Sequence, residues 1–261
     1  MRPGGFRRFP PPLWPLAAAL LFFGAAPASL SAQDEGEAGG GRSFFGALEW
    51  FLRGSIIVFP EDNGAASAPA PILPSLGGGV SYPCNDLLAL ELSLDLYGNT
   101  YDYDYRLGRA VPANDEFRST FVIGSVVGFQ PVFRFRPRGE QFTIRVYGGL
   151  AADLRICLLA YGLEKDEKHT NDRNPGTGHT VGEAAGDAAS YFWGRGRWLL
   201  PAAGAGMDFP ALDGLLLGFD IRVWFPLYRA WTGENLPLVE GFRLGIGFRA
   251  AFYKKSPGGT P

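Results

Sequence analysis

Apolar and polar residues alternate with a period of two along most of the chain. The clearest run has a leucine at every second position, at Leu88, Leu90, Leu92, Leu94 and Leu96. Polar residues such as Glu91 and Asp95 lie between these leucines. Successive side chains of a strand point to opposite faces, whereas a helix would scatter both sets around its circumference. The run therefore predicts a strand with one apolar and one polar face.

Eight segments carry this alternation, some more cleanly than others. The predicted strands are Phe44 to Phe59, Leu73 to Tyr82, Leu88 to Tyr97, Phe117 to Arg136, Phe142 to Leu158, Leu199 to Phe209, Leu215 to Tyr228 and Phe242 to Tyr253. Short turns are predicted at Pro83 to Asp86, Pro137 to Glu140 and Pro210 to Gly214, and longer polar loops at Pro60 to Ile72, Asp102 to Glu116, Tyr161 to Arg197 and Arg229 to Pro237. This arrangement is typical of a closed barrel in an outer membrane, with both termini at the short-turn end.

The two faces of the predicted strands differ in charge. The apolar positions of the seven clearer segments carry no charge. The opposite positions hold Glu49, Arg53, Glu91, Asp95, Arg118, Arg134, Arg136, Arg145, Asp153, Arg155, Asp208, Asp220, Arg222, Arg243 and Arg249. An uncharged face suits lipid, because an Arg or Lys at the bilayer midplane costs about 2 to 4 kcal/mol. It also suits the interior of a soluble lipocalin-like barrel, which would place the charges outside.

The composition of the charged face favours the membrane alternative. It holds arginine and no lysine, interleaved with many glycines. Guanidinium forks paired with carboxylates suit a packed polar interior better than a solvated surface. Aromatic residues also gather near both ends of the strands, as they do at the two interfaces of a membrane barrel. The predicted band at the long-loop end comprises Tyr101, Tyr103, Tyr105, Phe117, Tyr191, Phe192, Trp193, Trp198, Tyr228 and Trp231, and the band at the short-turn end comprises Tyr82, Phe133, Phe135, Phe142, Phe209, Phe252 and Tyr253. We therefore expect the charges inside and the apolar side chains toward lipid.

Four prolines lie inside predicted strands, at Pro74, Pro131, Pro201 and Pro226. Each lacks the backbone N–H that a sheet requires. We expect bulges or earlier strand ends at these positions.

The N-terminal segment has the pattern of a secretory signal peptide. Three arginines precede the apolar run Leu13 to Ala26, and small residues lead up to Ala32. A membrane anchor is the alternative, but the run contains Pro15 and is shorter than the roughly 20 residues that a spanning helix needs. The predicted organisation is a signal peptide over 1–32 with cleavage after Ala32, a flexible periplasmic leader over 33–42, a barrel over 43–253 and a short tail over 254–261. Cleavage after Ala28 is the alternative.

On these features the chain resembles the small eight-stranded outer-membrane barrels of the OmpA, OmpX and OmpW type, and the compact barrels of spirochaetes in particular. The resemblance covers nearly all of residues 43–253 and rests on architecture, not on a diagnostic motif. It implies an all-β, up-and-down, eight-stranded antiparallel transmembrane β-barrel in a Gram-negative-type envelope, with outer-membrane lipid as its partner. Members of these families commonly finish on an aromatic residue. Here Phe252 and Tyr253 are instead followed by the tail.

An eight-stranded barrel encloses a lumen just wide enough for side chains. The inward charges expected to fill it are Glu49, Arg53, Glu91, Asp95, Arg134, Arg145, Asp153, Arg155, Asp220, Arg222, Arg243 and Arg249. We expect Glu49 to pair with Arg53, and Asp153 with Arg155 and Arg145, because buried charges need partners. The network is then structural, or it forms a narrow polar conduit or gate in which the excess of arginine favours anions.

The expected function is that of a structural or surface-interaction protein whose extracellular loops contact solutes, host molecules or the cell surface. A narrow OmpW-like channel for small solutes is the alternative. A lipid A acyltransferase-like or deacylase-like barrel would need a serine or histidine placed with a carboxylate at the lipid-facing rim. Ser119 and Ser190 are available, but nothing in the sequence brings them together with a histidine, and we predict no catalytic residue.

The longest predicted loop contains both histidines and several acids. His169, Asp172 and His179 are its candidate interaction residues. Their spacing within glycine-rich sequence matches no ordered metal-ligand pattern, so we predict solvated loop residues, no metal and no cofactor.

Composition narrows the partners further. The 261-residue chain has a formal net charge of −2, which argues against nucleic acid because that ligand requires a clustered basic surface. Its two cysteines cannot form a disulfide framework. Cys84 and Cys157 are predicted near opposite ends of the barrel, too far apart to be joined, and remain free thiols.

Overall fold

A computed structural model describes residues 47–60, 71–113, 120–137, 141–159, 173, 178–232 and 241–253. Contacts divide the chain into residues 1–39 and residues 40–261, and every described residue lies in the second unit. The predicted signal peptide, the periplasmic leader and the C-terminal tail therefore lie outside the described residues, and so does Arg118.

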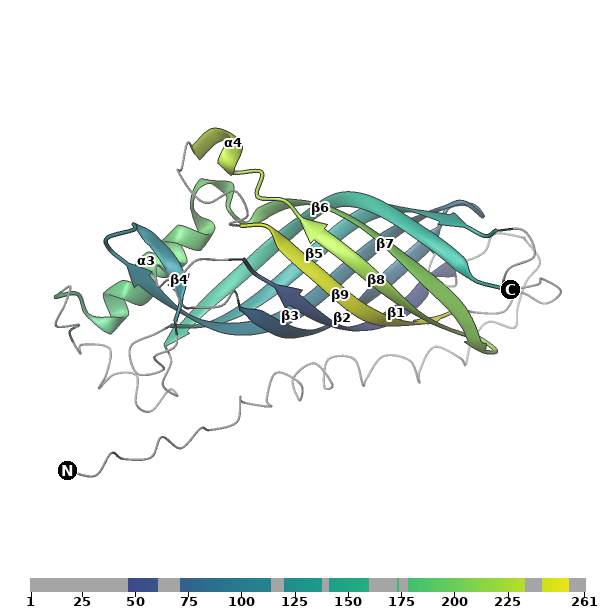
Figure 1. The fold of residues 1–261 in the computed structure, drawn as a ribbon, viewed down its shortest axis with the longest axis horizontal. Coiled ribbons are helices and arrows are strands. Elements are labelled where there is room, and N and C mark those ends of the chain that lie inside the picture. Colours follow the sequence, from purple (N-terminus) through teal and green to yellow (C-terminus); the bar gives the residue numbers. More distant parts are fainter. Residues whose placement is uncertain are drawn as a thin grey trace, which may run out of the picture. The chain divides into compact units, whose positions relative to one another are not determined.

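Eight long antiparallel strands form a closed barrel, which confirms the predicted fold class (Figure 1). They are β1 (Glu49–Val58), β2 (Ile72–Pro83), β3 (Leu88–Asp104), β5 (Thr120–Phe135), β6 (Thr143–Leu159), β7 (Leu199–Leu212), β8 (Leu215–Trp224) and β9 (Arg243–Phe252). Each strand pairs with its neighbours in the chain, and β1 pairs with β9 to complete the circle. Closure gives every strand two partners and so removes the exposed edge of an open sheet.

The alternation in the sequence becomes an alternation of burial in the barrel wall. In β1, Phe51, Arg53 and Ser55 are buried, whereas the intervening Leu52 and Ile56 are exposed. The same alternation continues across the pairing of β1 with β9, where Arg53 lies opposite Arg249 and Ile56 opposite Ile246. The charged residues therefore share the inner face with buried apolar side chains such as Phe51 and Ile57, whereas the large side chains of the outer face are apolar.

The connections differ at the two ends of the barrel. At one end, β7 and β8 are joined through Asp213 and Gly214 alone, and β2 and β3 through residues 84–87. At the other end lie β4 (Arg109–Pro112), α3 (Val181–Trp193), a short 3₁₀ segment (Gly194–Gly196) and the single turn α4 (Arg229–Thr232) (Figure 1). We call these the short-turn end and the capped end.

The capped end is more ordered than the sequence predicts. The segment Tyr161 to Arg197 was predicted to be a polar loop, but its second half contains α3. Within Asp102 to Glu116, the end of β3 pairs with β4 in a hairpin. Both elements are short, and they rest on packing against the barrel mouth, which period-two patterning does not reveal.

The prediction for the prolines is correct only at Pro226, which follows the end of β8 at Trp224. Pro74 and Pro201 sit in unbroken register opposite Ile56 and Leu150. Pro131 pairs with Leu90, although no pairing to β6 is formed there. The register shift occurs instead between Pro210 and Leu212, beside the tightest turn.

Candidate functional site: a charged lumen and a basic pocket at its mouth

The outer surface of the barrel is a continuous apolar belt. Large exposed hydrophobic side chains come from all eight barrel strands, among them Leu52, Ile72, Leu92, Phe129, Leu150, Ile156, Phe209, Leu217, Ile221, Ile246 and Phe248. Phe248 exposes 79 % of its surface. Soluble proteins rarely expose contiguous apolar patches of more than a few hundred Å², so this belt is suited to lipid.

Aromatic side chains border the belt, but only some of those predicted. At the short-turn end Phe133, Phe135, Phe209 and Phe252 are exposed, together with Trp50, which the sequence analysis did not include. At the capped end Trp193, Trp198 and Trp231 are exposed, whereas Tyr101, Phe192 and Tyr228 are buried. These three belong to the aromatic band predicted at the long-loop end, and that prediction is wrong because they pack into the mouth of the barrel.

The interior holds the charges. Eleven charged side chains are buried inside: Arg53, Glu91, Asp95, Arg145, Asp153, Arg155, Asp208, Asp220, Arg222, Arg243 and Arg249. Six arginines thus face five carboxylates. Glu49 and Arg134 lie at the short-turn rim and are partly exposed, and Arg136 is exposed.

The centre of the lumen is a compact cluster of Arg53, Asp95, Asp220 and Arg222, which we call the middle cluster. Asp95 accepts hydrogen bonds from Arg53 at 2.6 and 3.0 Å and from Arg222 at 2.6 Å. Asp220 lies 3.5 Å from Arg53 and 3.3 Å from Arg222. Ser55 accepts a further bond from Arg222 at 3.0 Å. Two guanidinium groups therefore face two carboxylates, as buried ion pairs require.

A second group of charges lies toward the short-turn end. Arg249 contacts Glu91 at 3.2 Å and Asp208 at 3.0 Å, and Asp208 also contacts Arg145 at 2.7 Å. Gln130 donates to Glu91 at 3.0 Å. Beyond this group, Arg134 pairs with Glu49 at 2.6 Å.

Two of the expected pairings are therefore different in the structure. Glu49 pairs with Arg134 and not with Arg53, and Arg145 pairs with Asp208 and not with Asp153. The expected pairs were close in sequence. Glu49 on β1 meets Arg134 on β5, a strand that does not pair with β1, and Arg145 on β6 meets Asp208 on the neighbouring β7. Both pairs depend on how the strands are arranged and not on the distance along the chain.

The third group of charges lies at the capped end around Asp153. This carboxylate accepts from Arg155 Nε and from Arg243 Nη2, each at 2.7 Å, and from the hydroxyl of Tyr97 at 2.7 Å. The Tyr97 hydroxyl itself accepts from Arg155 Nε at 3.0 Å. The expected pair of Asp153 with Arg155 is thus present, with Arg243 as the other partner.

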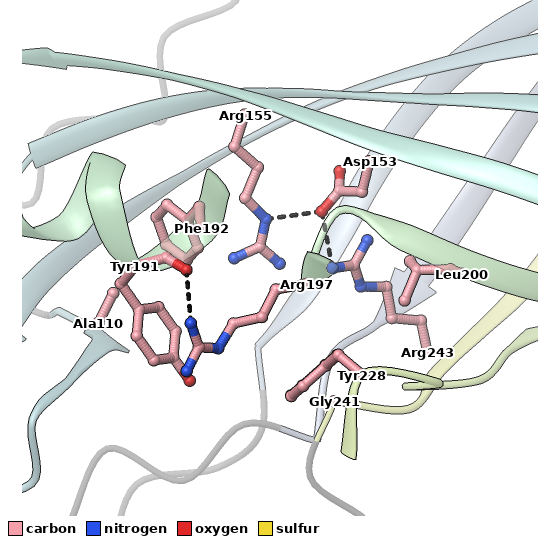
Figure 2. Close-up of a pocket in the computed structure, with 10 residues that line it drawn as sticks. All are labelled: Ala110, Asp153, Arg155, Tyr191, Phe192, Arg197, Leu200, Tyr228, Gly241 and Arg243. Atoms are coloured by element: carbon pink, nitrogen blue, oxygen red, sulfur yellow. Dashed lines mark hydrogen bonds and ion pairs between the residues drawn. The ribbon is translucent and has the colours of Figure 1, made fainter. Parts of the chain in front are cut away.

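A pocket opens above this group, and we call it the mouth pocket. Its lining residues are Ala110, Asp153, Arg155, Tyr191, Phe192, Arg197, Leu200, Tyr228, Gly241 and Arg243 (Figure 2). The space available to the centres of water molecules is about 30 Å³. Since one water needs roughly 10–15 Å³ by this measure, the pocket holds about two waters or one small ionic group.

The helix α3 supplies one wall of the pocket. Its Phe192 and Ala188 are buried in an apolar cluster with Tyr101, Ala110 and Val122 of the barrel wall and hairpin. The rings of Tyr101 and Phe192 meet edge to face at 5.0 Å. The indole of Trp193 donates to the backbone oxygen of Arg155 at 2.9 Å. These contacts fix the helix over the mouth.

The sequence analysis missed α3 and Arg197, although a signal for the helix was present. Thr180 and Glu183 form a capping box, in which each side chain bonds the other residue's backbone N–H. Val181, Ala188 and Phe192 follow at helical spacing and are buried. The pocket residue Arg197 has no comparable signal, because it belongs to no periodic run. Tyr228 was predicted to end a strand, but β8 ends at Trp224 and Tyr228 lines the pocket beyond it.

The predicted loop residues do not form a site in the described part of the chain. The ring of His179 stacks on Tyr105 at 3.9 Å, and its Nδ1 lies 3.9 Å from Glu183. His169 and Asp172 lie outside the described residues, as does Ser119. Ser190 is exposed on α3. Among the residues that the structure describes, no cluster of three His, Cys, Asp or Glu side chains could hold a metal ion.

The apolar belt and the charged lumen together decide between a membrane barrel and a soluble lipocalin-like barrel. A soluble barrel would bury its apolar face and solvate its charges, and this one does the reverse. The protein is a transmembrane β-barrel of the outer-membrane type. None of its described helices is long and apolar enough to span a membrane.

Comparison with solved structures finds similar barrels from outer membranes. Neisserial surface protein A is 10 % identical, with a TM-score of 0.43 over 80 % of this chain and 97 % of the other. The outer membrane protein OprG from Pseudomonas aeruginosa is 11 % identical, with a TM-score of 0.44 over 80 % and 97 %. Ail, the attachment invasion locus protein of Yersinia pestis, is 10 % identical, with a TM-score of 0.40 over 79 % and 97 %. No family model and no curated protein matches the chain.

Proposed function

We propose that this barrel is a closed, non-conducting membrane scaffold that presents the folded cap of α3 and the β3–β4 hairpin to molecules outside the cell. One observation carries the proposal. The inner face is occupied by charges that pair across the lumen, while the elements that exceed what a hairpin connection needs are gathered at one end. Extra length in such connections is often functional.

Packing at the cap supports a recognition surface of fixed shape. Tyr105 in the hairpin donates to Asp187 on α3 at 2.8 Å, and its ring also stacks on His179. The indole of Trp231 on α4 donates to the backbone oxygen of Arg195 at 2.9 Å. A preorganised surface loses less conformational entropy when it binds a partner than mobile loops do.

The proposal includes an orientation. With short turns on the periplasmic side and long connections outside, both ends of the barrel domain face the periplasm, as is usual for such barrels. Residues 1–32 would then serve as the export signal, with cleavage after Ala32. Sequencing of the N-terminus of the membrane-inserted protein tests the cleavage site.

Labelling of intact cells with a membrane-impermeant maleimide tests the orientation. Cys84 is exposed in the turn between β2 and β3, and Leu107 is exposed in the turn between β3 and β4. We expect Cys84 to react only after the outer membrane is permeabilised. In a Cys84→Ser background, Leu107→Cys should react in intact cells. The opposite pattern would place the cap in the periplasm and overturn the proposed surface role.

Planar-bilayer recording of the purified protein tests whether the lumen is closed. We expect no steady conductance from the unmodified barrel. The double variant Arg53→Ala with Asp95→Ala removes a buried pair without changing the net charge, and it should open a conducting path. Leu52→Ala, which alters the adjacent outward side chain, is the control and should stay silent. A steady conductance from the unmodified barrel would instead support a narrow channel for small solutes.

A further inference from the structure

The mouth pocket gathers more positive than negative charge. Arg155 and Asp153 come from β6, Arg243 from β9, and Arg197 from the segment after α3. Figure 2 shows Arg155 reaching in from the barrel wall, with Arg197 and Arg243 on the other side of the same space. Three guanidinium groups and one carboxylate give the lining a net charge of +2. Such an excess favours an anion, especially where burial lowers the local dielectric constant.

Asp153 already uses both of its oxygens. One accepts from Tyr97, and the other accepts from Arg155 and Arg243. Arg243 is only 5 % exposed, and its Nε and Nη1 have no hydrogen-bond partner among the described residues. A buried charged donor without a partner is costly, because it has lost its hydrogen bonds to water and gained none in the protein. An oxygen of a bound anion would supply the partner that these donors require.

The arginines are held in position by aromatic rings. The guanidinium of Arg155 lies 4.3 Å from the centre of the Phe192 ring and 5.2 Å from that of Tyr101. Arg197 lies 4.0 Å over Tyr191 and donates to the Tyr191 backbone oxygen at 3.0 Å. Stacking of this kind orients a guanidinium while leaving its in-plane N–H groups available for hydrogen bonds. The pocket is therefore organised before any ligand enters.

The size of the pocket restricts the ligand. Its 30 Å³ of space for water centres admits a compact group and excludes a bulky one. A planar guanidinium matches two oxygens of a phosphate or sulfate in a bidentate arrangement. We propose that the mouth pocket is a binding site for a single tetrahedral oxyanion group, phosphate or sulfate, held by Arg155, Arg197 and Arg243. The group is either a free ion or the end of a sugar phosphate whose remainder stays outside the pocket.

Calorimetric titration of the purified, folded, detergent-solubilised full chain tests this site. The probes are inorganic phosphate, inorganic sulfate and glucose 1-phosphate, with glucose as the neutral control, in a buffer and detergent free of phosphate and sulfate. We expect at least one of the three anions to bind with a dissociation constant of about 1 mM or tighter, and glucose not to bind. Binding of the inorganic ions identifies a free-ion site, and binding of glucose 1-phosphate alone identifies an ester site. If no anion binds, the proposal is wrong.

Two neighbouring arginines provide a matched pair of variants. Arg197 lines the pocket, whereas Arg195 is exposed outside it. Arg197→Gln should weaken anion binding by about 10-fold or more, which corresponds to one lost charge-assisted hydrogen bond. Arg195→Gln removes the same charge and should leave binding unchanged. Equal weakening in both variants would indicate general attraction by the cap and overturn the site.

A third variant probes the buried donors directly. Arg243→Lys keeps the positive charge beside Asp153 but lacks the planar fork. We expect it to weaken binding about as much as Arg197→Gln, because a lysine offers a point charge in place of two directed donors. Unchanged binding in this variant would contradict the role of Arg243. Electrophoresis in SDS with and without boiling checks that each variant is folded, because a closed membrane barrel migrates differently before and after heating. None of these titrations depends on the orientation of the barrel or on its conductance.

Discussion

The middle cluster and the mouth pocket use the same residue types in different proportions. In the middle cluster, two arginines face two aspartates, and all four side chains are at least 96 % buried. Among the described residues, the lining of the mouth pocket holds three arginines, Arg155, Arg197 and Arg243, and one carboxylate, that of Asp153. Asp153 is 3 % exposed and thus nearly as buried as Asp95 and Asp220, so the burial of the carboxylates does not distinguish the two sites. The ratio of cations to anions is what distinguishes the middle cluster from the mouth pocket.

This ratio separates a structural from a ligand-binding arrangement. Buried charges in equal numbers neutralise one another, even where an ion pair such as that of Asp220 with Arg222 is not a hydrogen bond, so they leave no net charge for a ligand. An excess of one sign leaves charge and hydrogen-bond donors for a group from outside. In this barrel the middle cluster, with equal numbers of cations and anions, lies deep in the lumen. The mouth pocket, with an excess of cations, opens at the capped end.

Removing a carboxylate from the middle cluster should have the largest effect on stability. Asp95→Asn removes the negative charge between Arg53 and Arg222 and leaves Asp220, at longer distances, as the carboxylate of the cluster. Breaking a buried pair in this way costs about 3–5 kcal/mol in the free energy of unfolding. Equilibrium urea unfolding in lipid vesicles measures the loss.

The short-turn rim offers the matched control for this change. Glu49 pairs with Arg134 at the same 2.6 Å, but the side chains are 27 % and 19 % exposed. Because solvent screens this pair, Glu49→Gln should cost about 1 kcal/mol or less. A similar loss of unfolding free energy in Asp95→Asn and Glu49→Gln would show that burial does not strengthen the ion pairs of the middle cluster.

A glycine next to the mouth pocket should give the next largest effect. A Cβ added at Gly124 would lie 1.9 Å from Cζ of Tyr97, whose hydroxyl holds Asp153. Gly124→Ala should therefore displace the Tyr97 ring, cost about 1–3 kcal/mol in unfolding and weaken anion binding at the pocket. Urea unfolding and calorimetric titration measure the two effects.

Gly54 is the control because it faces outward and has no other atom within 4 Å of its ideal Cβ position. Gly54→Ala should change stability by about 0.5 kcal/mol or less and leave anion binding intact. If Gly124→Ala lost stability but bound the anion normally, the link from Tyr97 through Asp153 to the pocket would be wrong.

The strands and their faces could be predicted because each is a local property. Period-two alternation puts Leu92 and Glu91 on opposite faces of the strand whatever the rest of the chain does. The composition of the charged face, with arginine and glycine and no lysine, then favours lipid on the uncharged side. The sequence therefore predicted the barrel and the inward direction of its charges.

The partners within the lumen could not be predicted in the same way. Asp95 is 42 residues from Arg53 and 127 residues from Arg222 in the chain. Such contacts depend on the stagger of all eight strands, which no local pattern specifies. The mouth pocket has the further requirement that α3 pack over the barrel, and so its arginines do not form a recognisable motif.

The smallest predicted effect concerns the start of α3, far from the lumen. The backbone N–H of Thr180 donates to Glu183 at 2.7 Å, and this bond together with the Thr180 side chain lowers the pKa of the Glu183 carboxyl below its ordinary value. A lowered pKa means that the bond stabilises the helix fully at pH values above the ordinary pKa. Its contribution is lost as the pH falls through the lowered pKa. Hydrogen exchange in the first turn of α3 should therefore accelerate in that acidic window, while Glu183→Gln, which does not titrate, should show no such change. An identical pH response in the unmodified protein and in Glu183→Gln would exclude Glu183 as the cause. If hydrogen exchange in the barrel strands also accelerated in the acidic window, the cap would be coupled to the lumen.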